Sequence, residues 1–298
     1  MLCHLTSLPT SGLDGTQRFL DWMSDAGYSA WQMLPVTPPD EHGSPYASPS
    51  AFAGWPELMQ SDRIESNVED DFWMQDWALY AAIKQAHEGR PWFEWPEPLR
   101  NRDHQALEAF RADAQIHLEQ QGRFNAAWAD LKHQASNQGI QLIGDVPIFI
   151  SHDSADVWAH RHLFQLDENG MPTHVAGVPP DYFSEDGQRW GTVLYDWEAH
   201  REDGWRWWKE RLKRMFRLFD TVRIDHFRGI HSNWAIPVDD DHAKNGHWQI
   251  GPGDEWLQAM VALVPSPENI LAEDLGIIPD EVIDLRRRFG LPGMAVLH

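Results

Sequence analysis

Apolar stretches of strand length alternate with stretches of helical period along most of this sequence. Residues 30–36 and 141–150 are apolar and short enough to be buried strands. Residues 204–219 carry apolar side chains on one helical face and most of their charges away from it. Because successive parallel strands need a long crossover, usually a helix, this alternation predicts a parallel sheet. We expect an α/β protein of the (β/α)8 TIM-barrel type, whose sites form at the carboxyl ends of strands.

The predicted elements leave that barrel incomplete, with about six of its eight strands. Strands are expected at residues 2–8, 30–36, 141–150, 221–227, 269–275 and 294–297, and helices at 16–26, 72–87, 204–219, 254–263 and 280–289, with one or two helices at 103–138. Residues 151–200, rich in proline, glycine and aromatic residues, are expected to be a long loop.

A mostly helical stretch separates the second and third strands and is too long for a single crossover. We therefore expect an inserted helical subdomain. The predicted parts are a barrel start with two strands and a substrate loop (1–56), the helical insert (57–139) and a barrel continuation (140–298), which includes an active-site loop at 176–195.

Charge and composition exclude several classes of partner. The 298 residues hold 46 acidic and 24 basic side chains, for a formal net charge of -22, whereas nucleic-acid binding needs a basic face. No apolar run approaches the ~20 residues of a membrane helix, so we expect no membrane partner. The single cysteine, Cys3, excludes an intrachain disulfide, and the first residues lack the features of a signal peptide. We expect a cytoplasmic protein; its oligomeric state is not predicted.

Tryptophan is abundant, with 17 in the chain. Those at helical spacing are expected in the core. Others lie in loops rich in proline and glycine, where a flat apolar ring is better explained by a ligand. Aromatic faces in a cleft suit sugar rings, whose C–H faces are apolar and whose edges carry hydroxyls.

Residues 221–229 form a segment that begins apolar and ends in charge. Side chains alternate across a strand, so Arg223 and Asp225 are predicted to project to the same side. A guanidinium beside a carboxylate favours its ionised form, which suits a nucleophile. A structural ion pair at a strand end is the alternative, and spacing alone leaves both open.

Three acidic residues, Asp145, Asp225 and Glu273, fall near the carboxyl ends of predicted strands. Neighbouring strands lie ~4.8 Å apart, so Asp225 and Glu273 are candidates for the pair of carboxyls, about 5–5.5 Å apart, of a retaining glycosidase. Acidic residues at loop starts are also commonly solvated or capping, and the pattern alone does not separate these readings.

Longer motifs carry a family resemblance. Arg-Ile-Asp-His-Phe-Arg-Gly (223–229) and Ala-Glu-Asp-Leu-Gly (272–276) resemble the nucleophile and acid/base segments of the amylomaltases, the 4-α-glucanotransferases of glycoside hydrolase family 77. Further matches are Leu-Thr-Ser-Leu-Pro (5–9), Trp-Gln-Met-Leu-Pro (31–35), Ser-Pro-Tyr (44–46), Ser-Ala-Phe-Ala-Gly (50–54), Gly-Asp-Val-Pro-Ile (144–148), Pro-Pro-Asp-Tyr-Phe-Ser-Glu-Asp-Gly-Gln-Arg-Trp-Gly (179–191) and Arg-Phe-Gly-Leu-Pro-Gly-Met (288–294). Together they span nearly the whole chain.

The resemblance implies roles for matching positions. Asp225 would be the nucleophile, Glu273 the acid/base, and Arg223 the residue that orients and ionises Asp225. Substrate contacts implied by the matching motifs come from His226, Asp145, Tyr46, Ser44, Asp181, Gln188 and Trp190, with Tyr182 and Phe183 at the apolar tip of a loop over the cleft. Such a lid would exclude water and favour transfer to a sugar over hydrolysis.

The implied reaction transfers α-1,4-glucan segments by a retaining double displacement. Donors and acceptors would be maltooligosaccharides and α-1,4-glucan, with glucose also an acceptor, and the chemistry requires no cofactor or metal. The family has a third catalytic carboxylate after its seventh strand, beyond His298 here, so we expect the 298 residues to be a C-terminally truncated fragment. Two other functions remain open from the sequence: a glucan-binding relic without activity, and an α-glucan hydrolase.

Overall fold

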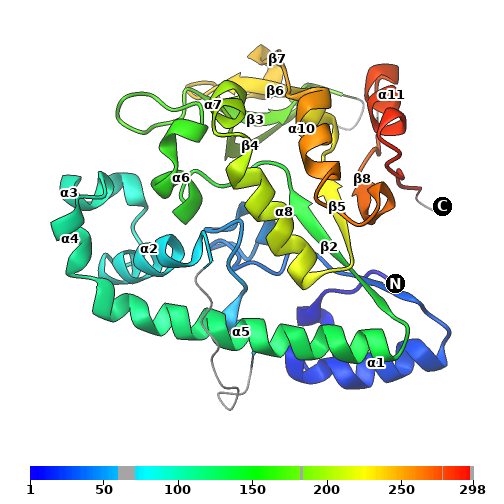
Figure 1. Ribbon diagram of the computed structural model, residues 1–298. Coiled ribbons are helices and arrows are strands. Elements are labelled where there is room, and N and C mark those ends of the chain that lie inside the picture. The colour runs from blue at the N-terminus through cyan, green and yellow to red at the C-terminus, as the bar shows by residue number, and fades with distance from the viewer. Residues whose placement is uncertain (60–70, 182–183, 277, 296–298) are drawn as a thin grey trace. The chain divides into compact units, whose positions relative to one another are not determined.

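The computed structural model describes residues 1–59, 71–181, 184–276 and 278–295 (Figure 1). These residues form two compact units that interleave along the sequence. The first comprises Met1–Asp145, Asp153–Ala159 and Arg214–Thr221, and the second comprises Val146–His152, His160–Lys213 and Val222–His298. The predicted division at residues 56 and 139 remains a prediction.

The first unit combines parallel strands with most of the long helices. Its elements are α1 (Thr16–Asp25), β1 (Ala30–Gln32), α2 (Met74–Ala86), α3 (Glu97–Arg100), α4 (His104–Glu108), α5 (Arg111–Asn137), the start of β2 (Gln141–Pro147), α6 (Ala155–Ala159) and the end of α8 (Arg206–Leu218). β1 and β2 pair in parallel, with Ala30 opposite Gln141 and Gln32 opposite Ile143. The helices expected at 16–26 and 72–87 are therefore confirmed, and that at 103–138 is two helices.

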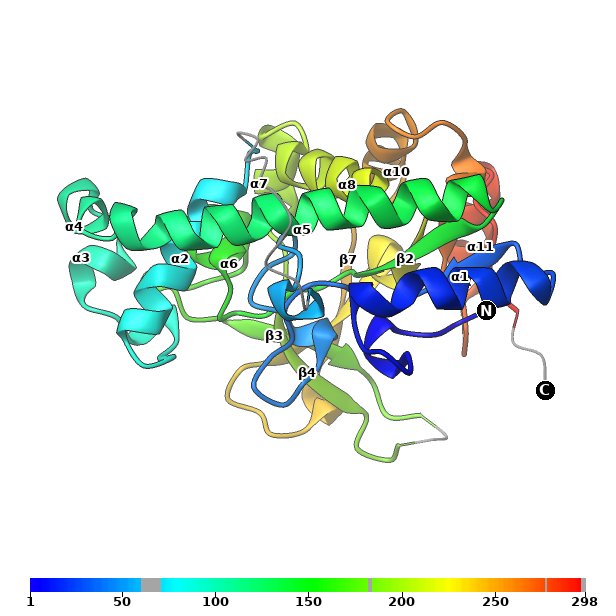
Figure 2. The ribbon, with the colours of Figure 1, turned by 90° about the horizontal axis from the view of Figure 1, so that it is seen from below.

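Helix α5 is the longest element of this unit and packs against both α1 and α2 (Figure 2). The buried face of α5 includes Leu118, Phe124, Trp128 and Leu131. Helix α4 precedes α5 and is capped by Asp103. The carboxylate of Asp103 accepts hydrogen bonds from the N–H groups of Gln105 and Ala106 at 3.0 Å each.

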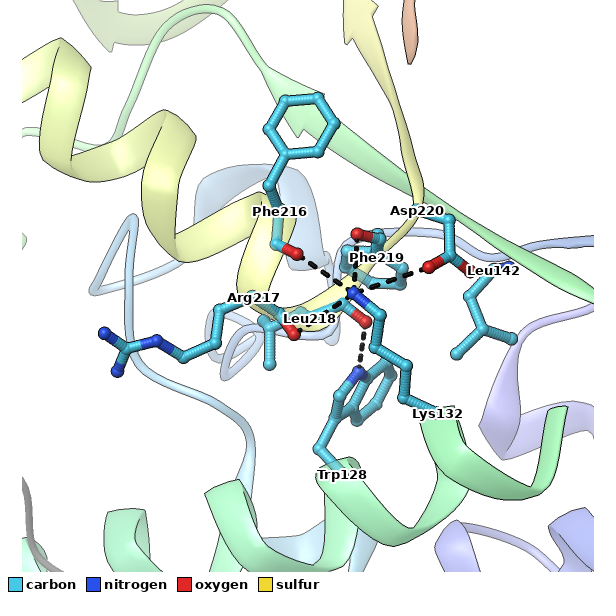
Figure 3. A network of polar contacts seen from close by, with 8 residues as sticks. All are labelled: Trp128, Lys132, Leu142, Phe216, Arg217, Leu218, Phe219 and Asp220. Carbon is cyan, nitrogen blue, oxygen red and sulfur yellow. Dashed lines mark hydrogen bonds and ion pairs between the residues drawn. The ribbon is translucent and has the colours of Figure 1, made fainter. Parts of the chain in front are cut away.

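Two side chains of α5 also cap the C-terminal end of α8 (Figure 3). The ammonium of Lys132 donates to the carbonyls of Phe216 and Phe219, both at 2.9 Å, and lies 3.5 Å from Asp220 Oδ1. Trp128 Nε1 donates to the carbonyl of Leu218 at 2.7 Å. The last carbonyls of a helix lack internal partners, so these donors supply them and place a positive charge at the negative end of the helix dipole.

The second unit holds an antiparallel sheet and a parallel strand pair. Its elements are β3 (His174–Val178), β4 (Gln188–Val193), α7 (Trp197–Glu202), the start of α8, β5 (Thr221–Asp225), α9 (Arg228–His231), β6 (Ser232–Pro237), β7 (His247–Ile250), α10 (Gly253–Val261), β8 (Ile270–Ala272) and α11 (Asp280–Arg288). The antiparallel sheet has the order β4-β3-β6-β7. β5 and β8 pair in parallel, with Val222 opposite Ile270 and Ile224 opposite Ala272.

Several predicted elements are wrong. Residues 2–8 form only the start of the expected strand: Leu2 makes a single parallel bridge to Gln32, whereas Leu5–Ser7 form a 3-10 turn. The loop expected at 151–200 contains α6, β3, β4 and α7, and strands β6 and β7 were not predicted at all. Of the strand expected at 294–297, the described residues Met294 and Ala295 are not in a strand, and the remainder lies outside the described residues.

Candidate active site

The parallel pairing of β5 and β8 brings two of the predicted carboxylates to the same sheet edge. Asp225 is the last residue of β5, and Glu273 directly follows β8. The hydrogen bonding between the two strands continues to Glu273, whose N–H donates to the carbonyl of Ile224 at 3.0 Å. Two acidic side chains therefore sit at adjacent carboxyl ends, where α/β folds build their sites.

Arg223 forms the ion pair with Asp225 that strand alternation predicts. Its Nη2 lies 2.7 Å from Asp225 Oδ1, and the two side chains are 12% and 31% exposed. The Nε of Arg223 donates to the sulfur of Met294 at 3.3 Å. The guanidinium is thus held on both sides, and the carboxylate of Asp225 keeps a partly open face.

Glu273 lies in a different environment from Asp225. Its Oε2 accepts from the backbone N–H of His226 at 3.0 Å, and its Oε1 from that of Leu275 at 2.9 Å. Burial is the main cause that raises the pKa of Glu273 above its ordinary value, and the nearby charge of Asp225 adds to it. The two N–H groups and Arg223 oppose this rise without cancelling it. A carboxyl group with a raised pKa is suited to donate a proton.

His226 has a left-handed backbone, with a φ of 50°, a conformation in which histidine is enriched among non-glycine residues. Its ring meets Trp190 edge to face at 4.8 Å and lies 6.4 Å from the ring of Phe149. Burial, and secondarily the charge of Arg228, lowers the pKa of His226 to about 4, so the ring is neutral at pH 7. Among the described residues its Nε2 has no hydrogen-bond partner, which leaves one polar atom for a ligand.

Strand β4 carries two further predicted contacts, Gln188 and Trp190. Trp190 Nε1 donates to Gln188 Oε1 at 3.0 Å, and Trp190 is 37% exposed. At the other end of the β3–β4 connection, Asp181 Oδ1 accepts from the N–H of Ser184 at 2.8 Å. Tyr182 and Phe183, the predicted tip, lie outside the described residues. Through Trp190, strand β4 contacts the ring of His226.

The remaining predicted contacts belong to the first unit. The hydroxyl of Tyr46 donates a hydrogen bond to Asp145 Oδ2 at 2.7 Å, and Asp145, which lies within β2 two residues before its end, is only 3% exposed. The N–H of Ser44 donates to Asp40 Oδ1 at 2.7 Å, which closes the turn that precedes Tyr46. The bond between Tyr46 and Asp145 links residues 99 positions apart and has no local sequence signal.

Two neighbours of the site were not predicted. Phe149 lies beside both Trp190 and His226, at 6.4 Å from each ring. The guanidinium of Arg228 lies 3.9 Å from the centroid of Trp248 on β7, a cation–π contact. Arg228 lies within the motif at 223–229, but its partner is on a strand that the sequence did not reveal.

Comparison with known proteins decides the family. The chain matches the model of glycoside hydrolase family 77, described as 4-alpha-glucanotransferase, over residues 3–72 and 60–298. It is 40% identical to the 4-alpha-glucanotransferase of Thermus thermophilus, with the whole chain aligned to 71% of that protein. The chain belongs to glycoside hydrolase family 77. The expected family resemblance is therefore confirmed.

Solved structures confirm the expected barrel-type fold of this family 77 chain. It superposes on the amylomaltase of Streptococcus agalactiae, solved in complex with acarbose, with a TM-score of 0.90 and 30% identity, over 99% of this chain and 72% of that one. The amylomaltase of Corynebacterium glutamicum gives a TM-score of 0.77 at 14% identity, over 98% of this chain and 50% of that one, and shows the fold alone.

Relatives are longer than this chain. The chloroplastic/amyloplastic 4-alpha-glucanotransferase of Arabidopsis thaliana is 37% identical over 94% of this chain, which spans 59% of that relative's length. Within the part of the chain that the structure describes, the helices are all too short or too polar to cross a bilayer.

Proposed function

We propose that this family 77 chain carries the catalytic pair of a retaining 4-α-glucanotransferase. The observation that carries the proposal is the contrast between two carboxylates at adjacent strand ends. Asp225 is ion-paired with Arg223, whereas the pKa of Glu273 is raised, mainly by its burial. One environment favours a charged nucleophile and the other a protonated acid, the division of labour that retaining chemistry needs.

In the first step, Asp225 attacks the anomeric carbon of the sugar, and Glu273 gives its proton to the departing glycosidic oxygen. The donor's remaining chain leaves, and a glycosyl ester with Asp225 remains. In the second step, a hydroxyl of an acceptor sugar attacks the same carbon, Glu273 takes the hydroxyl proton, and the carboxylate of Asp225 is released. Two inversions at one carbon retain its configuration.

The other predicted residues are proposed to hold the sugar rings. Neutral His226 offers a buried ring nitrogen, and Trp190 beside it offers an exposed aromatic face. Asp145 and Tyr46 are proposed to bind hydroxyls as a hydrogen-bonded pair. Further proposed contacts come from Ser44, Asp181 and Gln188, and from Tyr182 and Phe183.

We propose maltooligosaccharides and α-1,4-glucan as substrates, with glucose among the acceptors. The names of the relatives described above, 4-alpha-glucanotransferases and an amylomaltase, support this class of substrate. The cytoplasmic location expected from the sequence is retained as part of the proposal.

Incubation of the purified chain with maltotriose tests the proposal. Glucose together with maltopentaose and longer products is expected from transfer. Free reducing sugar without longer chains would indicate a hydrolase instead, and maltotriose binding without turnover would indicate a glucan-binding relic.

Variants assign the two roles. Asp225→Asn and Glu273→Gln are each expected to lower transfer at least about 10³-fold, because each removes a group used in both steps. Asp254→Asn, which alters an exposed acidic residue paired with Arg288, is the matched control and should retain full activity. Retained transfer in Asp225→Asn would exclude Asp225 as the nucleophile.

A further inference from the structure

Residues 48–54 form a buried stretch without helix or strand, directly after the loop that carries Tyr46. Phe52 is 2% exposed and Ala53 is fully buried. Irregular backbone is usually at the surface, because its N–H and C=O groups need partners once water is removed. The hydrogen-bond partners of these backbone groups therefore show what fixes residues 48–54 in position.

Some of these hydrogen bonds are made within residues 48–54 themselves. Ser50 Oγ accepts hydrogen bonds from the N–H groups of Phe52 at 3.1 Å and Ala53 at 3.0 Å. Ser48 Oγ donates to the carbonyl of Ser50 at 2.8 Å. These bonds shape a tight turn but do not attach it to the rest of the unit.

The attachment comes from residues distant in sequence. Gln121, on α5 and fully buried, makes two hydrogen bonds to one residue: its Oε1 accepts from Gly54 N–H and its Nε2 donates to Gly54 C=O, both at 2.8 Å. Asp156 Oδ2 accepts from the N–H of Ala51 at 2.8 Å. A Cβ at Gly54 would lie 2.1 Å from the ring of Phe124, so only glycine allows α5 to approach this closely.

From these contacts we infer that Gln121, on α5, is a positioning residue for the sugar-contacting loop at 44–46. The inference rests on the proposed function, which assigns sugar contacts to Ser44 and Tyr46. Tyr46 is held at its hydroxyl by Asp145, and the chain that follows it is held at Gly54 by Gln121. Loss of the amide at position 121 leaves two buried groups of Gly54 without partners and loosens the backbone behind Tyr46.

Variants at position 121 separate this role from a purely structural one. Gln121→Met keeps the length of the side chain but removes both hydrogen bonds. Gln121→Glu keeps an acceptor for Gly54 N–H and loses the donor to Gly54 C=O. Gln115→Met is the control, because Gln115 lies on the same helix with its amide exposed and bonded only weakly, at 3.3 Å, to Glu119.

Maltotriose disproportionation by each variant is measured with and without Tyr46→Phe. We expect Gln121→Met to raise KM about tenfold with kcat altered less than about threefold, Gln121→Glu to lie between, and Gln115→Met to match the parent. If Gln121 acts through Tyr46, the rise in KM shrinks below about threefold in the Tyr46→Phe background. An unchanged KM, or the same rise in both backgrounds, would overturn the inference.

Hydrogen–deuterium exchange gives a readout that needs no activity. Amides of residues 44–54 should exchange at least about tenfold faster in Gln121→Met than in the parent or in Gln115→Met, while distant amides stay protected. An inactive parent whose loop responds in this way would count against the proposed function but support the positioning role of Gln121. Unchanged exchange at 44–54 in both Gln121 variants would overturn that role, whatever the activity.

Discussion

His200 on α7 is a buried histidine whose environment predicts a loss of stability in mild acid. The side chain is fully buried, among the rings of Phe164, Tyr195, Trp197 and Trp207. Among the described residues neither ring nitrogen makes a hydrogen bond to a side chain, and the backbone of Leu163 only partly offsets the effect of burial. Burial, with smaller contributions from the charges of His162 and His160, lowers the pKa of His200 to about 3.

The sign and size follow from proton linkage. In the unfolded chain His200 takes up a proton near pH 6.5, whereas in the folded chain it stays neutral until about pH 3. The unfolded state therefore gains protons as the pH falls from 6.5 towards 3, and the free energy of unfolding falls with it. Each pH unit in this window corresponds to about 1.4 kcal/mol, which gives a loss of about 2 kcal/mol at pH 5 from this residue alone.

His200→Leu isolates this contribution. Leucine is of similar size and apolar, and it replaces a neutral ring that makes no hydrogen bond to a side chain, so we expect a change below about 1.5 kcal/mol at pH 7.5. Denaturant unfolding is followed by tryptophan fluorescence at pH 7.5 and 5.0. Between these pH values the parent should lose about 2 kcal/mol more than the variant.

The control for this experiment is His104→Leu, at an exposed position on α4, which should keep the pH dependence of the parent. If His200→Leu and the parent lose equal stability between pH 7.5 and 5.0, the folded chain does not hold His200 in its neutral form. The argument from burial would then be refuted.

Two further predictions concern other charged contacts. Lys132→Met should lower the free energy of unfolding by about 2–3 kcal/mol, because it removes the ammonium from the last carbonyls of α8. In thermal melts the control Lys213→Met, at an exposed pair with Glu210, should stay within about 0.5 kcal/mol of the parent. Equal melting temperatures for the two variants would refute the capping role of Lys132. Asp225→Asn should lower the pKa of Glu273, because the charge of Asp225 helps to raise that pKa. A ¹³C NMR titration of the Glu273 carboxyl group measures the change. An unchanged titration of Glu273 would contradict the proximity of the two groups.

The sequence predicted best where a local pattern determines the local structure. Helix α8 was expected from its periodicity, and Asp225 and Glu273 were expected together because each lies near the carboxyl end of a predicted parallel strand. The antiparallel sheet was missed because its strands do not alternate in burial: the middle three residues of β3, Val175 to Gly177, are all buried. Gly177 fits there because a Cβ would meet the carbonyl oxygen of Gln188 at 2.1 Å, a constraint that only the folded chain reveals.

Contacts between distant segments were beyond local prediction. The bonds from Tyr46 to Asp145 and from Gln121 to Gly54 join residues 99 and 67 positions apart. Both Tyr46 and Asp145 were predicted as sugar contacts through the family resemblance, but nothing in either motif indicates that they bond to each other. A short periodic pattern specifies which face of an element is buried, and not which residue it will meet.

The motifs at 223–229, 272–276 and 288–294 gain a physical explanation when their contacts are followed. Asp274, next to Glu273, accepts from the N–H of Met294 at 2.8 Å and pairs with Arg286 at 3.0 Å. Met294 in turn offers its sulfur to Arg223, the partner of Asp225. The third motif therefore supports both carboxylates at once.

Gly293 explains the glycine in that third motif. A Cβ there would lie 2.4 Å from Asp274 Oδ2 and 2.9 Å from the guanidinium carbon of Arg286. Any larger residue would displace the ion pair beside Glu273, and with it the turn that presents Met294 to Arg223. The separate environments of Asp225 and Glu273 thus depend on a residue that contacts neither carboxylate.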